Sequence, residues 1–383
     1  MNYLSLVSRR TFQTAVDRFL LNFSKKGKYS AGQKKKVCLL RLDGLGDVVM
    51  FADAIRCYRE LFDKKEYEIS LITEDWVAPL FENCPYLSRV ISCDTRRFKK
   101  DLAYRLRFLS DIKKSGYDVF INSCIQRELL YGDAMVYASG AGCRYGYSSL
   151  PQKVCERVIG DPFYTALVPR PEHIHEMEKN SVLVSLVAGE NIRPRKPLMD
   201  WYGKPDKTGY FVVAPGAKDA VRRWPETRFA SLCTILYEKL NLTPVIIGGK
   251  DDVRIADSIV KAVPGRVPIE NEADKLDLPS VAGLISGADF FIGNDSGPAH
   301  LATALGTKTF VIAAGGNFTN CLSYPKYLGL DHFPIHQSDT SCFDCGGRCR
   351  YKIEGIFLCI NNISVEQASE TILKNLKDGR VQK

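Results

Sequence analysis

The sequence lacks the features that mark several classes of protein. No stretch approaches the roughly 20 apolar residues of a membrane-spanning helix. The N-terminus has no continuous apolar core and no small-residue cleavage site, so we expect no secretory signal peptide. Internal repeats and low-complexity segments are also missing. A hydrophobic content of 45% and a charged content of 25% are typical of an ordinary globular protein.

The 13 cysteines do not indicate an exported disulfide framework. Their number is odd, the chain is 383 residues long, and no export signal precedes them. This combination favours a reducing compartment, so we expect a cytoplasmic protein. At about 150 residues per domain, the length predicts two domains.

The formal net charge of +9 is concentrated at one end of the chain. Residues 1–36 carry nine basic side chains against the single acid Asp17, so the remaining chain is nearly neutral. No aromatic-rich basic groove is evident, and we therefore expect no nucleic-acid partner.

The basic N-terminal segment has a helical apolar pattern, formed by Leu4, Phe12, Val16, Phe19, Leu20 and Phe23. A basic amphipathic helix of this kind lies in the headgroup region of anionic membranes. Residues 1–30 therefore predict a peripheral location on the inner face of the cytoplasmic membrane. The alternative is a helix packed on the body of the protein, followed by a basic linker.

Short apolar runs alternate with helical patterns from Val37 onward, which predicts βαβ units and parallel sheets. Two series of this kind are separated by residues 191–209, which are rich in proline, glycine and charge and typical of a linker. The fold class predicted is α/β, with two Rossmann-like doubly wound domains facing across a ligand cleft. The expected segments are a basic tail at 1–36, a first domain at 37–190, the linker at 191–209, a second domain at 210–363, and a C-terminal helix and tail at 364–383.

The expected elements follow from the same periodicity. The strands predicted are 37–40, 69–72, 90–91, 119–121, 210–214, 245–247, 290–292 and 309–312. The helices predicted are 48–62, 76–83, 101–114, 226–240, 251–262 and 298–305.

Asp47 is the first candidate functional residue. In "LDGLGDVVMF", residues 42–51, it stands after a glycine turn that follows a buried strand, at the start of a helical pattern. In isolation it is interpreted as a helix-capping or first-turn acid that satisfies free N–H groups. The other motifs of the chain change that interpretation.

The loop after the strand 210–213 has the composition of an anion site. In "APGAKDAVRRWPETRF", residues 214–229, Gly216 permits close approach of backbone N–H groups, and Lys218, Arg222 and Arg223 add positive charge. Pro225 then opens a helix. Glycine, basic side chains and a helix start are what a diphosphate requires. The alternative is a solvated basic loop.

A third loop, "IGNDSGPAHLATALG" at 292–306, joins a strand to a helix near Pro298. Ser296 and Gly297 offer N–H groups at the helix start, and Asp295 offers a carboxylate to sugar hydroxyls. The alternatives are a capping Asp295 and a structural His300. None of the three loops matches the dinucleotide fingerprint G-x-G-x-x-G or a P-loop.

In combination, these motifs resemble glycosyltransferase family nine, the ADP-heptose:lipopolysaccharide heptosyltransferases. The resemblance covers roughly residues 37 to 375. Its matching elements are "RLDGLGDVV", "APGA…RRWPETRFA", "VIIGG" and "LISGADFFIGNDSGPAHLATALGTKTFVI", with a weaker match in "YDVFINS…CRYGY". It implies the GT-B fold, inversion at the transferred sugar, and transfer without a metal cofactor. By this resemblance the second domain binds the nucleotide-sugar donor and the first binds the acceptor.

The resemblance also implies roles for individual residues. Asp47 matches the proposed general base, and Arg222 stands where many members have the lysine that neutralises the donor diphosphate. The backbone donors are matched by Gly216 and Ala217, and the donor-sugar and phosphate loop by Asp295, Ser296, Gly297 and His300. An inverting transferase needs such a base, which contributes about 10²–10⁴ in rate, and the departing diphosphate needs positive charge.

Four cysteines in "CFDCGGRCRYKIEGIFLC", residues 342–359, form a C-x2-C-x3-C-x9-C pattern: Cys342, Cys345, Cys349 and Cys359. A C-x2-C beside glycines suits a metal knuckle, and four thiolates complete a tetrahedral site for structural zinc or iron. The segment is similar in kind to the iron finger of the family-nine subgroup that glycosylates bacterial autotransporters. The alternative is a set of reduced cysteines without metal.

The function predicted is an inverting glycosyltransferase that moves a sugar, heptose from ADP-heptose, onto a lipopolysaccharide-core or other cell-surface glycan acceptor. The nearest variant has a protein acceptor of the autotransporter type. A GT-B sugar-nucleotide epimerase is a second enzymatic alternative. A non-catalytic sugar-nucleotide-binding or membrane-associated protein on the same fold is an alternative of another class.

Overall fold

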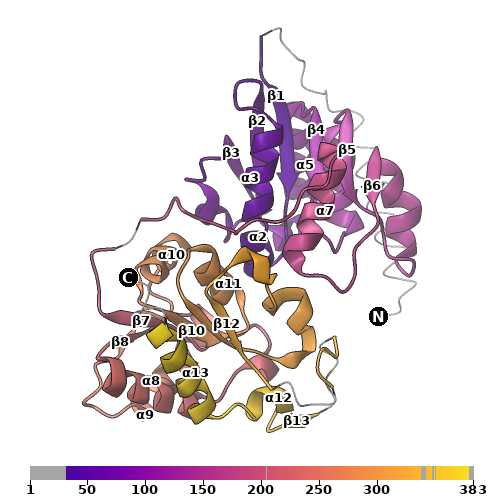
Figure 1. The fold of residues 1–383 in the computed structure, drawn as a ribbon. Coiled ribbons are helices and arrows are strands. Elements are labelled where there is room, and N and C mark those ends of the chain that lie inside the picture. Colours follow the sequence, from indigo (N-terminus) through magenta and orange to yellow (C-terminus); the bar gives the residue numbers. More distant parts are fainter. Residues whose placement is uncertain (1–31, 204, 338–341, 347–348, 350, 379–383) are drawn as a thin grey trace. The chain divides into compact units, whose positions relative to one another are not determined.

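The computed structural model describes residues 32–203, 205–337, 342–346, 349 and 351–378. Its described residues fall into two compact units (Figure 1). Unit 1 contains residues up to 44, with 51–172 and 177–194, and unit 2 contains 45–50, 173–176 and the chain from 195 onward. The predicted boundaries at 37–190 and 210–363 stay predictions. The predicted amphipathic segment 1–30 lies outside the described residues.

Unit 1 is built on a six-stranded parallel sheet with the strand order β3-β2-β1-β4-β5-β6. This is the order of a doubly wound sheet, in which the direction of winding reverses between β1 and β4. The strands are β1 (Lys35–Leu40), β2 (Tyr67–Glu74), β3 (Arg89–Cys93), β4 (Val119–Asn122), β5 (Cys143–Tyr147) and β6 (Ala166–Val168).

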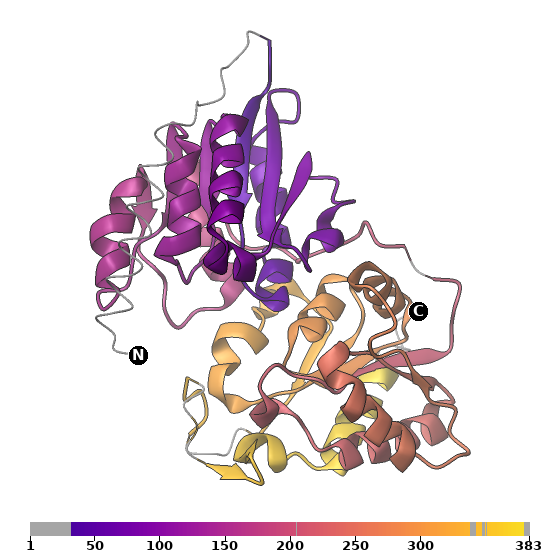
Figure 2. The same cartoon turned by 180° about the vertical axis from the view of Figure 1, so that it is seen from behind.

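Helices cover both faces of this sheet because successive side chains of a strand point to opposite faces. Cys38 and Leu40 of β1 enter one apolar cluster with Leu109 of α5 and Met135 of α6. The other face is covered by α3 and α7, which lie toward the viewer in Figure 1, whereas α5 and α6 lie toward the viewer in Figure 2. The helices are α3 (Ala52–Leu61), α4 (Thr95–Lys100), α5 (Leu102–Ser115), α6 (Ala134–Ser139) and α7 (Glu176–Ala188), with shorter turns η1 (Ala78–Phe81), η2 (Leu129–Asp133), η3 (Glu156–Gly160) and η4 (Asp161–Phe163).

Unit 2 repeats the same topology with the order β12-β11-β10-β7-β8-β9. All neighbouring strands in the sheet are parallel, and the winding reverses between β7 and β10. The strands are β7 (Tyr210–Ala214), β8 (Thr243–Ile246), β9 (Glu270–Asn271), β10 (Phe291–Asn294), β11 (Thr309–Ile312) and β12 (His332–Ile335). A separate antiparallel pair is formed by β13 (Lys352–Ile353) and β14 (Ile356–Phe357).

The main core of unit 2 lies between this sheet and α8, α9 and α13. The buried rings of Phe211, Phe290 and Phe310 join the strands to this core. On the other face lie α10 and α11 (Figure 1). The helices and turns are α2 (Leu45–Met50), η5 (Ala220–Arg222), α8 (Glu226–Leu240), η6 (Lys250–Asp252), α9 (Val253–Ala262), α10 (Leu278–Gly287), α11 (Gly297–Ala304), η7 (Gly315–Asn317), η8 (Phe318–Leu322), η9 (Lys326–Leu328), α12 (Leu358–Asn361) and α13 (Val365–Asp378).

The predicted α/β fold class with doubly wound parallel sheets is confirmed. One element differs clearly, because the single helix predicted at 48–62 is two helices, α2 and α3, separated at Phe51. The two helices belong to different compact units, α2 to unit 2 and α3 to unit 1, so adjacent turns of chain pack in different surroundings. The helix predicted at 76–83 is a short 3-10 turn that contains Pro79.

Sequence periodicity gave no indication of a buried ion-pair network in unit 1. Arg127, whose side chain is 2% exposed, binds both carboxylate oxygens of Asp133 and also pairs with Asp161 at 2.6 Å. Its guanidinium lies 4.2 Å from the ring centroid of Tyr164, whose hydroxyl donates to Asp133. The network ties the loop after β4 to the loop after β5, two neighbouring strands.

In the part of the chain that is described, no helix is long and apolar enough to cross a membrane. All 13 cysteines lie among the described residues, and each is a thiol rather than half of a disulfide.

Candidate functional site

The predicted donor loops lie at the reversal point of the second sheet. The loop 214–225 follows β7 and the loop 295–300 follows β10, and these two strands are hydrogen-bonded neighbours. Because both strands end at the same edge, their loops emerge side by side. Ligands of open α/β sheets bind at this position, outside the carboxyl ends of the strands where the winding reverses.

Asn294 joins the two loops and was not predicted as a site residue. Its side chain is completely buried at the end of β10. The amide Nδ2 donates to the Pro215 carbonyl at 2.6 Å, and Oδ1 accepts from the Trp224 backbone N–H at 3.1 Å. The loop 215–224 is therefore fixed at both ends to one side chain of the neighbouring strand.

Arg222 reaches from the first loop to the second. Its Nη1 donates to the Asp295 carbonyl at 3.3 Å and lies 3.6 Å from Asp295 Oδ2, while Nη2 pairs with Asp219 Oδ2 at 3.1 Å. Its side chain is 27% exposed, so it is not fully enclosed by the protein. Arg223 acts differently, because its Nε donates to the carbonyl of Ala217 and so stabilises the loop itself.

The remaining residues predicted for the first loop occupy distinct positions. Ala217 is buried, Gly216 is half-buried, and Lys218 is exposed. The Gly216 backbone lies close to the carboxylate of Asp252, which accepts from the Gly249 N–H at 3.0 Å. Asp252 was not predicted here, since it follows a different strand, β8.

The second loop leads directly into α11. Ser296 is the N-cap residue of α11, but its hydroxyl donates back to the Asn294 carbonyl and makes no capping bond to the helix. Gly297 is the first residue of the helix. The side chain of Ser296 therefore does not compete with a ligand for the N–H groups at this helix start.

His300 lies in the interior of unit 2, one turn into α11, and is 4% exposed. Its Nδ1 is 2.8 Å from the hydroxyl of Tyr324. Burial lowers the pKa of His300, and the nearby carboxylates of Asp295 and Glu176 oppose that shift only in part. The ring is therefore neutral at pH 7.

Asp47 lies in the first turn of α2 and is half-buried. This helix belongs to unit 2 and packs against α11, where Leu45 lies against Gly297. Gly46 allows the closest approach, because a Cβ at that position would come within 2.6 Å of Cδ2 of His300. The helix with the predicted base and the helix with the predicted donor loop are thus in direct contact within one compact unit.

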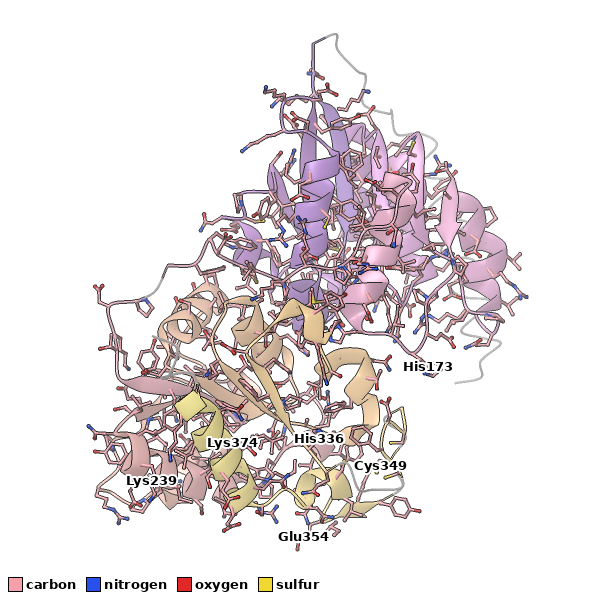
Figure 3. All side chains as sticks on the ribbon, in the orientation of Figure 1. His173, Lys239, His336, Cys349, Glu354 and Lys374 are labelled. Atoms are coloured by element: carbon pink, nitrogen blue, oxygen red, sulfur yellow. The ribbon has the colours of Figure 1, made fainter. Side chains whose placement is uncertain are left out.

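The four cysteines of the C-terminal segment line one small cavity of about 10 Å³, together with Gly315, Gly316 and Phe357. Figure 3 labels Cys349 on the loop that follows β12, with His336 just past the end of that strand. A cavity of this size accommodates a single atom-sized occupant. The spacing predicted that these cysteines act together, and the cavity is where they meet.

The four cysteines line one cavity but are not arranged as metal ligands. Among the described residues, no set of three or more His, Cys, Asp or Glu side chains is arranged as metal ligands. The Cys349 thiol instead donates to the Tyr351 carbonyl at 3.2 Å. Burial raises the pKa of the Cys359 thiol, so metal binding would have to displace its proton.

Comparisons with known proteins agree with this fold. The chain is similar to the solved glycosyltransferase family 9 protein of Veillonella parvula, with a TM-score of 0.72 and 17% identity over 91% of this chain and 100% of the other. It is also similar to E. coli heptosyltransferase WaaC with ADP, at a TM-score of 0.68 and 17% identity over 89% and 99%. The iron-containing dodecameric heptosyltransferase TibC gives a TM-score of 0.54 and 14% identity over 92% and 78%. These likenesses define a protein of the GT-B fold.

Sequence matches also lead to the heptosyltransferases. The model of glycosyltransferase family 9 (heptosyltransferase) matches residues 171–313, which contain both donor loops. Lipopolysaccharide heptosyltransferase 1 of Campylobacter coli is 20% identical over 297 residues, 72% of this chain and 83% of that protein. Lipopolysaccharide heptosyltransferase 3 of E. coli K12 is 32% identical over 111 residues, 29% of this chain and 31% of that protein. These matches confirm the resemblance to the heptosyltransferase family that the motifs predicted.

Replacing Arg222 should weaken binding of a nucleoside diphosphate. We expect Arg222→Met to lower ADP affinity roughly 10- to 100-fold, since a hydrogen bond to a charged group contributes about 1.5–3 kcal/mol. Arg222→Lys should lose less, because it keeps the charge but not the planar fork. Isothermal titration calorimetry measures both, with Arg266→Met as the matched control at a surface ion pair. Unchanged ADP affinity in Arg222→Met would contradict the assignment.

Proposed function

We propose that this protein transfers heptose from ADP-heptose to a lipopolysaccharide-core acceptor, with inversion at the anomeric carbon. The observation that carries the proposal is the contact of α2 with α11, which brings the helix of Asp47 against the helix that follows the predicted phosphate loop. The family match and the named relatives, which are lipopolysaccharide heptosyltransferases, support the donor and the acceptor class.

The proposed reaction is a single displacement. The acceptor hydroxyl attacks the anomeric carbon on the face opposite the diphosphate, and its proton passes to the carboxylate of Asp47. The bond between that carbon and the phosphate oxygen breaks, and ADP leaves with one more negative charge. Arg222 and the N–H groups at the start of α11 stabilise this charge. No step needs a metal ion.

Asp47→Asn should separate chemistry from binding. The amide keeps the size of the side chain but cannot accept the proton, so we expect kcat to fall about 10²–10⁴-fold while ADP affinity changes little. The assay follows heptose transfer from ADP-heptose to heptose-deficient lipopolysaccharide. Asp111→Asn, on the exposed surface of α5, is the matched control.

Three outcomes would change the proposal. Full activity of Asp47→Asn would remove Asp47 as the base. Product formation without any added acceptor would favour the epimerase. Wild-type protein that binds ADP-heptose but transfers nothing to glycan or protein acceptors would favour the non-catalytic alternative.

We further propose that Cys342, Cys345, Cys349 and Cys359 hold one structural zinc or iron ion. The shared cavity supports this, since four thiolates and room for one atom suit a tetrahedral metal. Rotation of the thiol side chains would have to complete the site, with Cys349 exchanging its carbonyl partner for the metal. The alternative acceptor, a protein, is supported only by the resemblance of this cysteine segment to that of the autotransporter subgroup.

Metal analysis tests this site directly. We expect about one equivalent of zinc or iron per chain after purification, lost in the double variant Cys342→Ser/Cys345→Ser and retained in Cys143→Ser, an exposed cysteine of unit 1. Chelation should lower Tm by about 2–4 °C for each kcal/mol that the metal contributes. Metal-free wild-type protein whose Tm is insensitive to added zinc and iron would contradict the proposal.

We also propose that residues 1–30 bring the enzyme to anionic membrane surfaces, where a lipid-linked acceptor resides. The charge and apolar spacing of that segment support this. Deletion of residues 1–30 should abolish co-sedimentation with vesicles rich in anionic lipid, and high salt should weaken binding of the full chain. Equal sedimentation of both proteins would refute it.

A further inference from the structure

Tyr324 is a buried residue that no sequence motif indicated. It lies between η8 and η9, and its hydroxyl is 2.8 Å from Nδ1 of His300. This is the only hydrogen bond of the Tyr324 hydroxyl among the described residues. Burial raises the pKa of the phenol and lowers that of the imidazole, so both groups are neutral at pH 7.

When both Tyr324 and His300 are neutral, the hydrogen bond between them can have either of two directions. If Nδ1–H donates to the tyrosine, the phenolic hydrogen is left without an acceptor in the interior. If the phenol donates to Nδ1, the phenolic hydrogen is satisfied, and the imidazole carries its own hydrogen on Nε2, which is not among the fully buried nitrogens that lack a partner. An unsatisfied buried donor is costly, so the second arrangement is favoured.

The rings are also held in place by their neighbours. Tyr324 packs against the rings of His175 and His332, with centroids 4.5 Å and 4.7 Å away. His175 is itself fixed by a 3.0 Å hydrogen bond from Nε2 to the Cys321 carbonyl. On its other side, the His300 ring edge abuts Gly46. The phenol can therefore dictate which nitrogen of His300 carries the proton without the ring turning away.

We propose that Tyr324 is a positioning residue that holds the proton of His300 on Nε2, and so makes His300 a hydrogen-bond donor toward phosphate oxygens of the bound nucleoside diphosphate. This inference rests on the proposed function for its ligand. The opposite tautomer would present a lone pair on Nε2, which repels phosphate oxygen rather than binding it.

Nitrogen-15 NMR of histidine-labelled full-length protein tests the tautomer without any ligand. His300 is assigned by its absence in His300→Gln. We expect the wild-type ring at pH 7.5 to show protonated Nε2 and unprotonated Nδ1, and Tyr324→Phe to shift these signals toward a mixture of tautomers. Tyr327→Phe, an exposed tyrosine of the same segment, should leave them unchanged. A wild-type His300 protonated on Nδ1 would overturn the proposal even if Tyr324→Phe does not fold.

A double-mutant cycle tests the consequence for binding. Tyr324→Phe should lower ADP affinity roughly three- to tenfold in the wild-type background, but by less than about twofold in the His300→Ala background, because Tyr324 acts through His300. Equal losses in both backgrounds would show that Tyr324 acts independently and would overturn the proposal. If wild-type protein binds no ADP, the proposed function fails, while the NMR experiment still decides the role of Tyr324.

Discussion

The candidate site depends on one buried side chain, Asn294. A parallel sheet brings the ends of β7 and β10 together but does not determine the path of the loops that follow them. The Asn294 amide does so by donating to Pro215 and accepting from Trp224. Trp224 is itself anchored, since its indole N–H donates to the Ile363 carbonyl. Arg222 therefore reaches Asp295, since the Asn294 side chain fixes the loop that contains Arg222.

The second constraint is the short distance between α2 and α11. Glycine at positions 46 and 297 removes the side chains that would hold the two helices apart. This contact explains why glycine immediately precedes Asp47 in the motif at residues 42–51. A catalytic role of Asp47 alone would not require a glycine there. Gly46 allows the helix that carries this acid to pack directly against the imidazole of His300. The capping interpretation of Asp47 and the catalytic one are compatible, because the acid lies in the first turn of its helix.

The sequence was most informative where local periodicity governs structure. The strands at 37–40, 210–214 and 309–312 were predicted almost residue by residue, since buried strands of parallel sheets are continuous apolar runs. It was least informative for contacts between distant segments. Tyr324 stands 24 residues from His300 and is one of 18 tyrosines, so nothing local distinguishes it. The break at Phe51 also has a non-local origin, since α2 and α3 pack in different compact units.

Backbone connections link the cysteine segment to the interior of unit 2. Asp344 and Gly346 donate their N–H groups to the carbonyls of Gly315 and Gly316, which begin the loop after β11. That loop continues through η8 to Cys321, whose carbonyl binds His175, and to Tyr324. An interaction that fixes the cysteine segment therefore also restricts the loop that contains Tyr324. A structural ion bound by the cysteines would therefore act on the donor loops through the backbone, because it would limit where the Tyr324 hydroxyl can lie. It would need no contact with the nucleotide.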